Sequence, residues 1–231
     1  MCSSDLINRT IRIEKIAIKD VKMRTFITED VSRNEMVQHV YDITYGTVRA
    51  GEDTLVVIDD SIVRGTTLKE SIIRMLGRLK PKKIIVVSSS PQIRYPDCYG
   101  IDMSKMGDFI AFNAAVSLLK EQGRADFLQE LLQRCKELEA TGKLHEENVV
   151  RQLYKQFTTD EITDQIARLI TPVDLGIPVQ VIFQKIEDLH ASCPNNLGDW
   201  YFTGNYPTPG GNRVVNKAFM NYMEGKNVRG Y

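Results

Sequence analysis

The segment from Leu55 to Thr67 reads Leu-Val-Val-Ile-Asp-Asp-Ser-Ile-Val-Arg-Gly-Thr-Thr, and it constrains the fold of this chain more than any other segment. It begins as an apolar run, which is typical of a strand buried on both faces of a parallel sheet. Asp59 and Asp60 follow where such a strand leaves the sheet. Gly65 then permits a tight turn, and we expect a helix to begin directly after it. The segment therefore predicts a strand, an acidic pair, a short loop and a helix in succession.

This succession suits a phosphorylated sugar. The free N–H groups and the dipole at a helix N-terminus favour a phosphate, and Thr66 and Thr67 add hydroxyl donors there. Gly65 lets the backbone come close to the ligand. Asp59 and Asp60, one sugar length away, can accept hydrogen bonds from ribose hydroxyls or hold Mg²⁺ through oxygen ligands. A purely structural turn needs no pair of adjacent carboxylates.

At these residues the sequence resembles the phosphoribosylpyrophosphate (PRPP) loop of the type I phosphoribosyltransferases. With Ser61 and Arg64 included, the loop is similar to one branch in particular, the amidophosphoribosyltransferases. Three further segments match that branch in the same order along the chain. They are Arg24-Thr25-Phe26-Ile27, Ser89-Ser90-Pro91-Gln92-Ile93-Arg94-Tyr95-Pro96 running on to Tyr99-Gly100-Ile101-Asp102-Met103, and Phe202-Thr203-Gly204-Asn205-Tyr206-Pro207.

The resemblance implies an α/β fold, namely a partial type I phosphoribosyltransferase fold with a parallel sheet and a helical insertion. It implies formation of 5-phosphoribosylamine from PRPP and glutamine, with release of glutamate and pyrophosphate, as the first step of purine synthesis. Mg²⁺ would lie at Asp59 and Asp60, and Lys22 and Arg24 would belong to a loop that closes over PRPP. Purine nucleotides would inhibit a homo-oligomer. The residues that would contact PRPP are Asp59, Asp60, Ser61, Arg64, Gly65, Thr66 and Thr67.

Two other classes of protein with a similar strand do not fit the loop. A response-regulator receiver would place its acidic pair near the start of a domain and would lack Arg-Gly-Thr-Thr after it. A P-loop NTPase needs Gly-x-x-x-x-Gly-Lys-Ser/Thr, which is absent from the chain. A non-catalytic module that binds PRPP or a purine nucleotide as a regulator stays open, although regulatory relatives commonly lose one carboxylate of the pair. An oligomerisation unit built on the helices of residues 113–157 stays open as well.

The bulk properties fit a cytoplasmic enzyme. The chain has 231 residues, with 30 basic and 30 acidic side chains and a formal net charge of 0. This balance gives no reason to expect a nucleic-acid or membrane partner. No apolar run approaches the roughly 20 residues that a membrane helix needs, and the N-terminus lacks the apolar region of a signal peptide.

The four cysteines, Cys2, Cys98, Cys135 and Cys193, show no spacing typical of disulfides or zinc. Some members of the resembled family bind an iron–sulfur cluster through one Cys after Pro96 and a Cys-x-x-Cys before Phe202. Here those positions hold Asp97, Gly198 and Tyr201. We therefore expect no iron–sulfur cluster.

Cys2 raises a separate question, because in this family an N-terminal cysteine is the nucleophile of a glutaminase domain. The residues after it, Ser3-Ser4-Asp5-Leu6, do not match the family motif. About fifty residues separate Cys2 from the strand that begins at Leu55, whereas a domain of ordinary size has on the order of 100–200 residues. We therefore expect an incidental cysteine. By the layout of the family, we also expect that the glutaminase domain and the start of the phosphoribosyltransferase domain are missing, which would leave the isolated chain inactive.

Periodicity predicts the other elements. Strands are expected at Thr10–Ile18 and Val21–Thr28, with a turn at Lys19-Asp20, and a helix from a capping box at Ser32 to about Gly46. A second capping box, Thr67 with Glu70, is expected to open the helix after the PRPP loop. Lys83–Ser88 reads as a second buried strand. It completes a strand–helix–strand unit with ligands at the carboxyl ends of the strands.

The second half of the chain is expected to be mainly helical. Apolar stripes run from Phe127 to Leu138 and from Val149 to Phe157. Val179–Phe183 reads as a short strand, Gln184–Ala191 as a short helix and Asn205–Asn212 as an irregular tail. We expect a phosphoribosyltransferase core at 1–112, a helical insertion at 113–157, and the end of the phosphoribosyltransferase region with a tail at 158–231.

Overall fold

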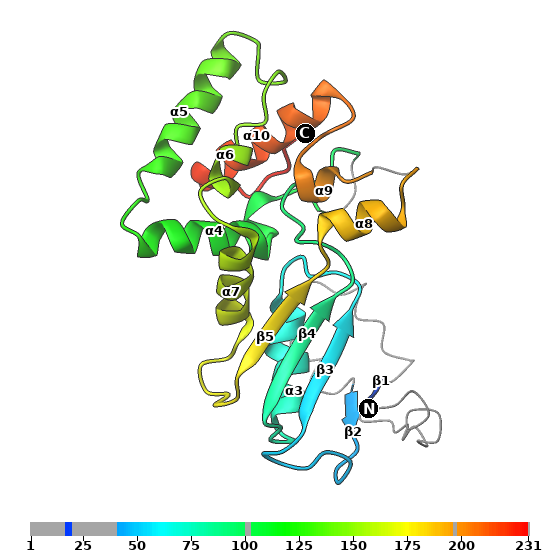
Figure 1. Ribbon diagram of the computed structural model, residues 1–231. Helices are drawn as coiled ribbons and strands as arrows, with labels where there is room; N and C mark the ends of the chain where they lie inside the picture. The colour runs from blue at the N-terminus through cyan, green and yellow to red at the C-terminus, as the bar shows by residue number, and fades with distance from the viewer. Residues whose placement is uncertain (1–16, 20–40, 100–102, 196–197, 231) are drawn as a thin grey trace.

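The computed structural model describes residues 17–19, 41–99, 103–195 and 198–230, and it shows a mixed α/β protein. A parallel three-stranded sheet occupies one end of the molecule and a group of helices the other (Figure 1). A separate two-stranded antiparallel ribbon lies beside the sheet, at its β3 edge. The strands are β1 (Ala17–Lys19) and β2 (Tyr41–Ile43) in the ribbon, and β3 (Thr54–Asp59), β4 (Lys83–Ser88) and β5 (Val179–Phe183) in the sheet.

The sheet contains the predicted strand–helix–strand unit. Strand β3 leads through a helical segment into β4, and β4 pairs in parallel with both neighbours, so that the order is β3-β4-β5. The predicted bounds of β4 and β5 are confirmed. Because all three strands run the same way, their carboxyl ends meet at one edge of the sheet, which faces the helical end of the molecule (Figure 1). The connecting segment consists of a π-helix, η1 (Leu68–Ile73), and the α-helix α3 (Arg74–Gly77).

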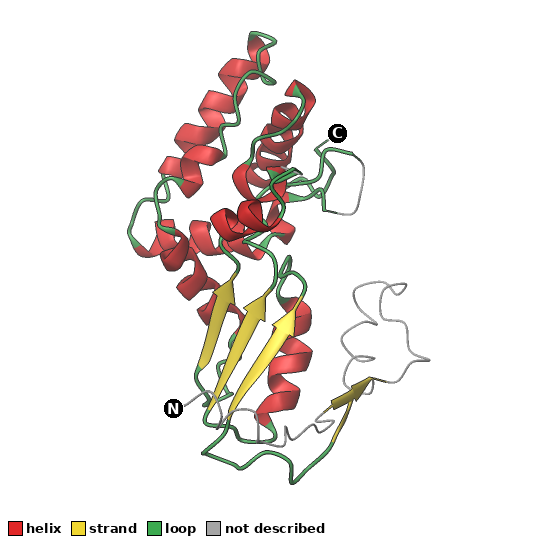
Figure 2. Ribbon diagram, turned by 45° about the vertical axis from the view of Figure 1, so that its right-hand side comes forward, coloured by secondary structure: helices red, strands yellow, loops and turns green. Residues whose placement is uncertain are grey.

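The two faces of the sheet differ in burial. One face packs against helices and buries Leu55, Ile84, Val86 and Val181. On the other face Val56 and Ile58 are 60% and 76% exposed, and Ile182, which follows them across the strands, is 44% exposed. No described helix covers this second face, which is turned toward the viewer in Figure 2. The prediction that β3 is buried on both faces is therefore wrong for the described part of the chain.

The helices pack into one continuous core with the sheet. Helix α7 contacts both β5 and α4, and α10 contacts α5, so that sheet and helices are linked through α7 and α4. The predicted stripe on α5 is confirmed, because Leu128, Leu131, Cys135 and Leu138 are buried. These elements are η2 (Met106–Asp108), α4 (Ile110–Glu121), α5 (Phe127–Ala140), α6 (Arg151–Tyr154), α7 (Thr159–Ile170), α8 (Ile186–Ser192), α9 (Trp200–Thr203) and α10 (Pro209–Met223).

The capping box predicted at Thr67 is not formed. Thr67 already has helical angles, with φ −61° and ψ −40°, and its side chain makes no capping bond. An N-cap needs an extended backbone so that its side chain can turn back toward the first N–H groups. Thr158 has that backbone, and it forms a complete capping box with Glu161 at the start of α7. Glu70 instead pairs with Arg74 one turn along the helix.

Two further expectations are corrected. The tail expected at Asn205–Asn212 contains the start of α10, with Pro209 at its first position, where proline is favoured. Gly211 lies inside this helix, and the position has to be glycine because a Cβ there would meet the ring of Tyr206. The helix expected to continue to Gly46 is wrong over Tyr41–Ile43, which pairs antiparallel with Ala17–Lys19.

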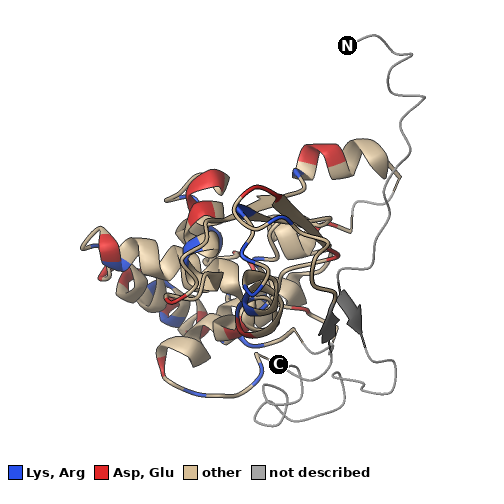
Figure 3. Cartoon of the chain, turned by 90° about the horizontal axis from the view of Figure 1, so that it is seen from below, with Lys and Arg blue, Asp and Glu red and all other residues tan. Residues whose placement is uncertain are grey.

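Several predictions lie outside the described residues. They include Cys2, the strand at 21–28 with Lys22 and Arg24, and the helix at 32–40. The division at 113 and 157 stays a prediction. Among the described helices none is long and apolar enough to cross a membrane. Basic and acidic residues are interspersed in the view of Figure 3, in keeping with the zero net charge.

Candidate functional site

The acidic pair lies at the carboxyl edge of the sheet, as predicted. Asp59 is the last residue of β3 and lies opposite Ser88 of β4. Its side chain is half-buried, whereas Asp60 is exposed. The Asp60 N–H donates to Asp59 Oδ1 at 3.0 Å, and Ser61 Oγ donates to Asp60 Oδ1 at 3.3 Å. The three side chains therefore form one short, solvent-accessible acidic turn.

The electrostatics of the turn favour a cationic or hydrogen-bond-donating ligand. Burial raises the pKa of Asp59 above its usual 3.8, the charge of Asp60 adds to the rise, and the hydrogen bond from the Asp60 backbone opposes it. A raised pKa means that the ionised carboxylate is held at some cost in free energy. A cation or a pair of sugar hydroxyls at this position would relieve that cost.

The first half of the PRPP loop (residues 59–67) is fixed to the neighbouring strand end. Ser89 donates its N–H to the Asp59 carbonyl at 2.9 Å, and its Oγ lies 3.2 Å from the carbonyls of both Asp59 and Asp60. Ser89 begins the third of the four segments, in chain order, that resemble the amidophosphoribosyltransferases. The structure thus brings two of the four matching segments together at the acidic pair.

The second half of the loop is fixed to the turn before α4. Ile110 donates its N–H to the Val63 carbonyl at 2.7 Å, and the Arg64 guanidinium pairs with Asp108 at 3.1 Å. Gly65 has φ +73°, and a Cβ there would lie 2.7 Å from Ile110 Cδ1, so a side chain would strain both backbone and packing. The glycine is therefore required by the path of the loop itself.

Thr66 and Thr67 lie at the exposed start of the helix, where the first N–H groups have no partner within the helix. Two hydroxyls and these N–H groups are thus available at one end of the loop, with two carboxylates at the other. The order of the groups is the predicted one, with carboxylates at the end of the strand and hydroxyls at the start of the helix. Asp108 was not predicted from the sequence, because a single Asp before an apolar helix carries no signal of its own.

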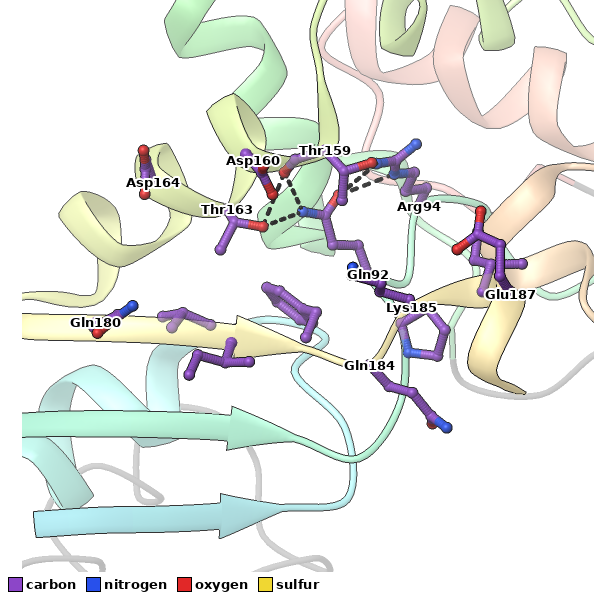
Figure 4. Close-up of a pocket in the computed structure, with 15 residues that line it drawn as sticks. Gln92, Arg94, Thr159, Asp160, Thr163, Asp164, Gln180, Gln184, Lys185 and Glu187 are labelled. Atoms are coloured by element: carbon purple, nitrogen blue, oxygen red, sulfur yellow. Dashed lines mark hydrogen bonds between the residues drawn. The ribbon is translucent and has the colours of Figure 1, made fainter. Parts of the chain in front are cut away.

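A cavity of about 720 Å³ lies elsewhere, along β5 between α7 and α8, and no residue of the PRPP loop lines it. Figure 4 shows Gln92 directed toward α7, where its amide donates to the Thr159 carbonyl at 3.0 Å and to Thr163 Oγ at 2.8 Å. Arg94 donates to Gln92 Oε1 at 2.7 Å. The buried Gln92 amide is therefore bonded to α7 and to Arg94 and serves the packing of this segment.

The loop after β4 is joined to the segment around α9 by a polar network. Asp97 is fully buried, and it accepts hydrogen bonds from the Tyr201 hydroxyl at 2.7 Å and from the Tyr99 N–H at 2.8 Å. Tyr206 donates its hydroxyl to the Pro96 carbonyl at 2.7 Å. Burial and the contact with Asp97 raise the pKa of Tyr201 to about 12.

Asp97 and Tyr201 occupy two of the positions where some amidophosphoribosyltransferases have cluster-binding cysteines. A carboxylate and a phenol hydrogen-bonded to each other do not provide the thiolates that such a cluster needs. The side chains at these positions therefore do not fit an iron–sulfur cluster.

A dedicated metal centre is also not found among the residues that the structure describes, since no three His, Cys, Asp or Glu side chains are grouped for one. Mg²⁺ differs from other metals in this respect, because one or two carboxylates with water and substrate phosphates suffice to bind it. Asp59 and Asp60 fit that mode of binding.

The chain is similar in sequence to known amidophosphoribosyltransferases over part of its length. No family model matches it. Amidophosphoribosyltransferase from Haemophilus influenzae is 43% identical over 70 residues, which are 30% of this chain and 14% of that protein. The enzymes of Schizosaccharomyces pombe and Staphylococcus epidermidis are each 35% identical, over 95 and 108 residues; these are 39% and 47% of this chain, and 18% and 22% of theirs.

A solved structure is also similar: the glutamine PRPP amidotransferase from B. subtilis complexed with ADP and GMP. It aligns with 84% of this chain and 32% of its own, at 24% identity and a TM-score of 0.44. The relation to the amidophosphoribosyltransferases rests on the sequence matches. In these matches the chain spans 14% to 22% of the length of the curated relatives. The chain thus contains a segment related to part of the amidophosphoribosyltransferases, as its loop sequence predicts.

Proposed function

We propose that the PRPP loop binds PRPP and that the chain supplies the phosphoribosyl-transfer site of an amidophosphoribosyltransferase. The observation that supports this most directly is the exposed acidic turn at the end of β3, which lies one short loop away from the free start of a helix. Asp59 and Asp60 would accept hydrogen bonds from the ribose hydroxyls. Gly65, Thr66 and Thr67 would hold the 5′-phosphate.

Magnesium enters this proposal as the cation bound with the substrate. Asp59 and Asp60 would hold it through carboxylate oxygens, and it would neutralise charge on the pyrophosphate. Ser61, which contacts Asp60, would help to keep the acidic turn in place. Lys22 and Arg24, outside the described residues, remain proposed contributors of positive charge to a closing loop.

The proposed reaction is displacement of pyrophosphate by ammonia. A bond forms between nitrogen and C1 of the ribose, while the bond from C1 to the pyrophosphate oxygen breaks and its electron pair leaves with pyrophosphate. The nitrogen then loses a proton to give 5-phosphoribosylamine. Catalysis would come from positioning the substrate, neutralising the leaving group and excluding water. Hydrolysis of glutamine, the source of ammonia, is assigned to no described residue.

Purine nucleotides are proposed as further ligands of the same loop, since a nucleoside monophosphate shares the ribose 5-phosphate of PRPP. A homo-oligomer and a cytoplasmic location are proposed from the resemblance alone.

The proposal is tested by isothermal titration of the 231-residue chain with PRPP, with and without Mg²⁺. We expect saturable binding that weakens when the metal is chelated. Thr66→Ala with Thr67→Ala should weaken it by about tenfold, the loss of one to two hydrogen bonds. Thr141→Ala, at the far end of α5, is the matched control. A folded chain that binds no PRPP would contradict the proposal.

A further inference from the structure

The pair between Arg64 and Asp108 gives Arg64 a role different from direct phosphate binding. Arg64 Nη2 lies 3.1 Å and Nε 3.4 Å from the same carboxylate oxygen of Asp108. The two side chains are 33% and 34% exposed, so the pair is only partly open to solvent. Forty-four residues separate them in the chain, and their contact joins two different elements.

The surroundings of Asp108 are rigid. It is the last residue of η2, and Phe109, directly after it, is fully buried. Asn113 reaches back from α4 and donates its side-chain amide to the Gly107 carbonyl at 2.8 Å, which holds the turn against the helix. Gly107 itself lies against the ring of Tyr222, where a Cβ would come within 3.2 Å. Asp108 therefore presents its carboxylate from a fixed position.

The loop on the other side is joined to η2 and α4 by polar contacts just before its turn at Gly65. The Ile110 N–H donates to the Val63 carbonyl, and Arg64 forms its ion pair with Asp108. Gly65 follows at once with its positive φ, and its carbonyl accepts the N–H of Lys69 to start the helix. The ion pair thus lies immediately before the residues proposed to hold the phosphate.

We infer that Asp108 is a positioning residue, which holds Arg64 so that the backbone at Gly65 and Thr66 is already arranged for the 5′-phosphate. This inference rests on the proposed function. It assigns Arg64 to the same positioning role, and leaves the phosphate to backbone N–H groups and threonine hydroxyls.

The variants separate positioning from direct binding. Asp108→Asn keeps the shape and removes the charge, and we expect about a threefold to tenfold rise in Kd for PRPP. Arg64→Ala should cause a similar rise, and the two changes should be less than additive in the double variant, because they remove the same contact. Exchange of the pair, Arg64→Asp with Asp108→Arg, should restore much of the affinity. Asp174→Asn is the matched control: it breaks the ion pair between Arg74 and Asp174 at 2.8 Å and should leave the Kd unchanged.

A second measurement does not depend on PRPP. In the ligand-free chain, the N–H groups of Lys69 and Ile110 donate to the Gly65 and Val63 carbonyls at 2.9 and 2.7 Å. Their amide hydrogen exchange should be faster in Asp108→Asn than in wild type, and unchanged in Asp174→Asn. Unchanged exchange together with an unchanged Kd would overturn the inference. A much larger loss in Arg64→Ala than in Asp108→Asn, with no recovery in the exchanged pair, would also overturn it and make Arg64 a phosphate ligand. If wild type binds no PRPP, the proposed function fails, while the exchange experiment still decides the positioning role.

Discussion

Two loops leave the carboxyl edge of the sheet side by side, and they differ in how their polar groups are used. The PRPP loop after β3 keeps Asp60, Thr66 and Thr67 exposed. The loop after β4 buries Gln92 and Asp97 almost completely, and its polar groups bond to α7 and to the α9 segment. Both loops contain segments that resemble the amidophosphoribosyltransferases.

The difference shows that a sequence match alone does not separate binding residues from structural ones. A buried polar group that is fully bonded contributes to stability, and it would have to lose those bonds to contact a ligand. An exposed polar group at the end of a parallel strand has little structural role and is free to bind. The loop after β4 should therefore respond to mutation through stability, and the PRPP loop through affinity.

The largest effect on stability is expected where α9 holds the loop after β4 through the hydrogen bond from Tyr201 to Asp97. Tyr201→Phe removes the hydroxyl that donates to the buried Asp97 carboxylate, and the free energy of unfolding should fall by about 1.5–3 kcal/mol, as for other hydrogen bonds to charged groups. Urea denaturation measures this. Tyr99→Phe is the matched control, because the Tyr99 side chain is 61% exposed, and it should cost less than about 0.5 kcal/mol. Equal stabilities of the two variants would remove the proposed contrast.

A smaller effect is expected at Asp59, and its sign depends on pH. Because the pKa of Asp59 is raised in the folded protein, its ionisation costs stability above the usual value of 3.8, and this cost is absent below it. Asp59→Asn should therefore raise the Tm by about 1 °C at pH 7, with the gain disappearing toward pH 4. The side chain is half-buried, so solvent screening keeps the effect small. Calorimetry at both pH values checks it; a gain that grows toward pH 4 would contradict the assigned cause.

Much of the sheet could be predicted from the sequence, because apolar runs of β-branched residues define strands locally. Lys83–Ser88 and Val179–Phe183 were both predicted with the observed bounds. Burial could not be predicted in the same way. Val56 and Ile58 have the composition of residues covered on both faces, yet whether a face is covered depends on elements that pack on it, not on the strand itself.

Local motifs failed where the backbone path was set by packing. Thr67-x-x-Glu70 and Thr158-x-x-Glu161 have the same pattern, but only Thr158 has the extended backbone of an N-cap. Gly65, packed against Ile110, starts the helix early, so that Thr67 already lies within it. Helix α10 was missed because its first residues are Pro, Gly and Asn, which favour turns unless tertiary contacts decide otherwise.

In the candidate site, too, local features could be predicted from the sequence and tertiary contacts could not. Asp59 and Asp60 were placed correctly because the end of a strand is a local feature. The contacts that fix the loop, from Ser89 and Asp108, come from residues distant in sequence, and their pairing is set only by the fold.

The central claim is that the acidic pair binds PRPP with Mg²⁺ and contributes nothing to stability. The most direct measurement is titration of Asp59→Asn with Asp60→Asn against PRPP and Mg²⁺, together with its Tm. The account predicts a Tm no lower than wild type, because repulsion between the carboxylates is removed, and loss of Mg²⁺-dependent PRPP binding, because asparagine cannot offset the charge of the metal. A variant that melts as wild type does and binds PRPP with unchanged affinity would contradict the claim.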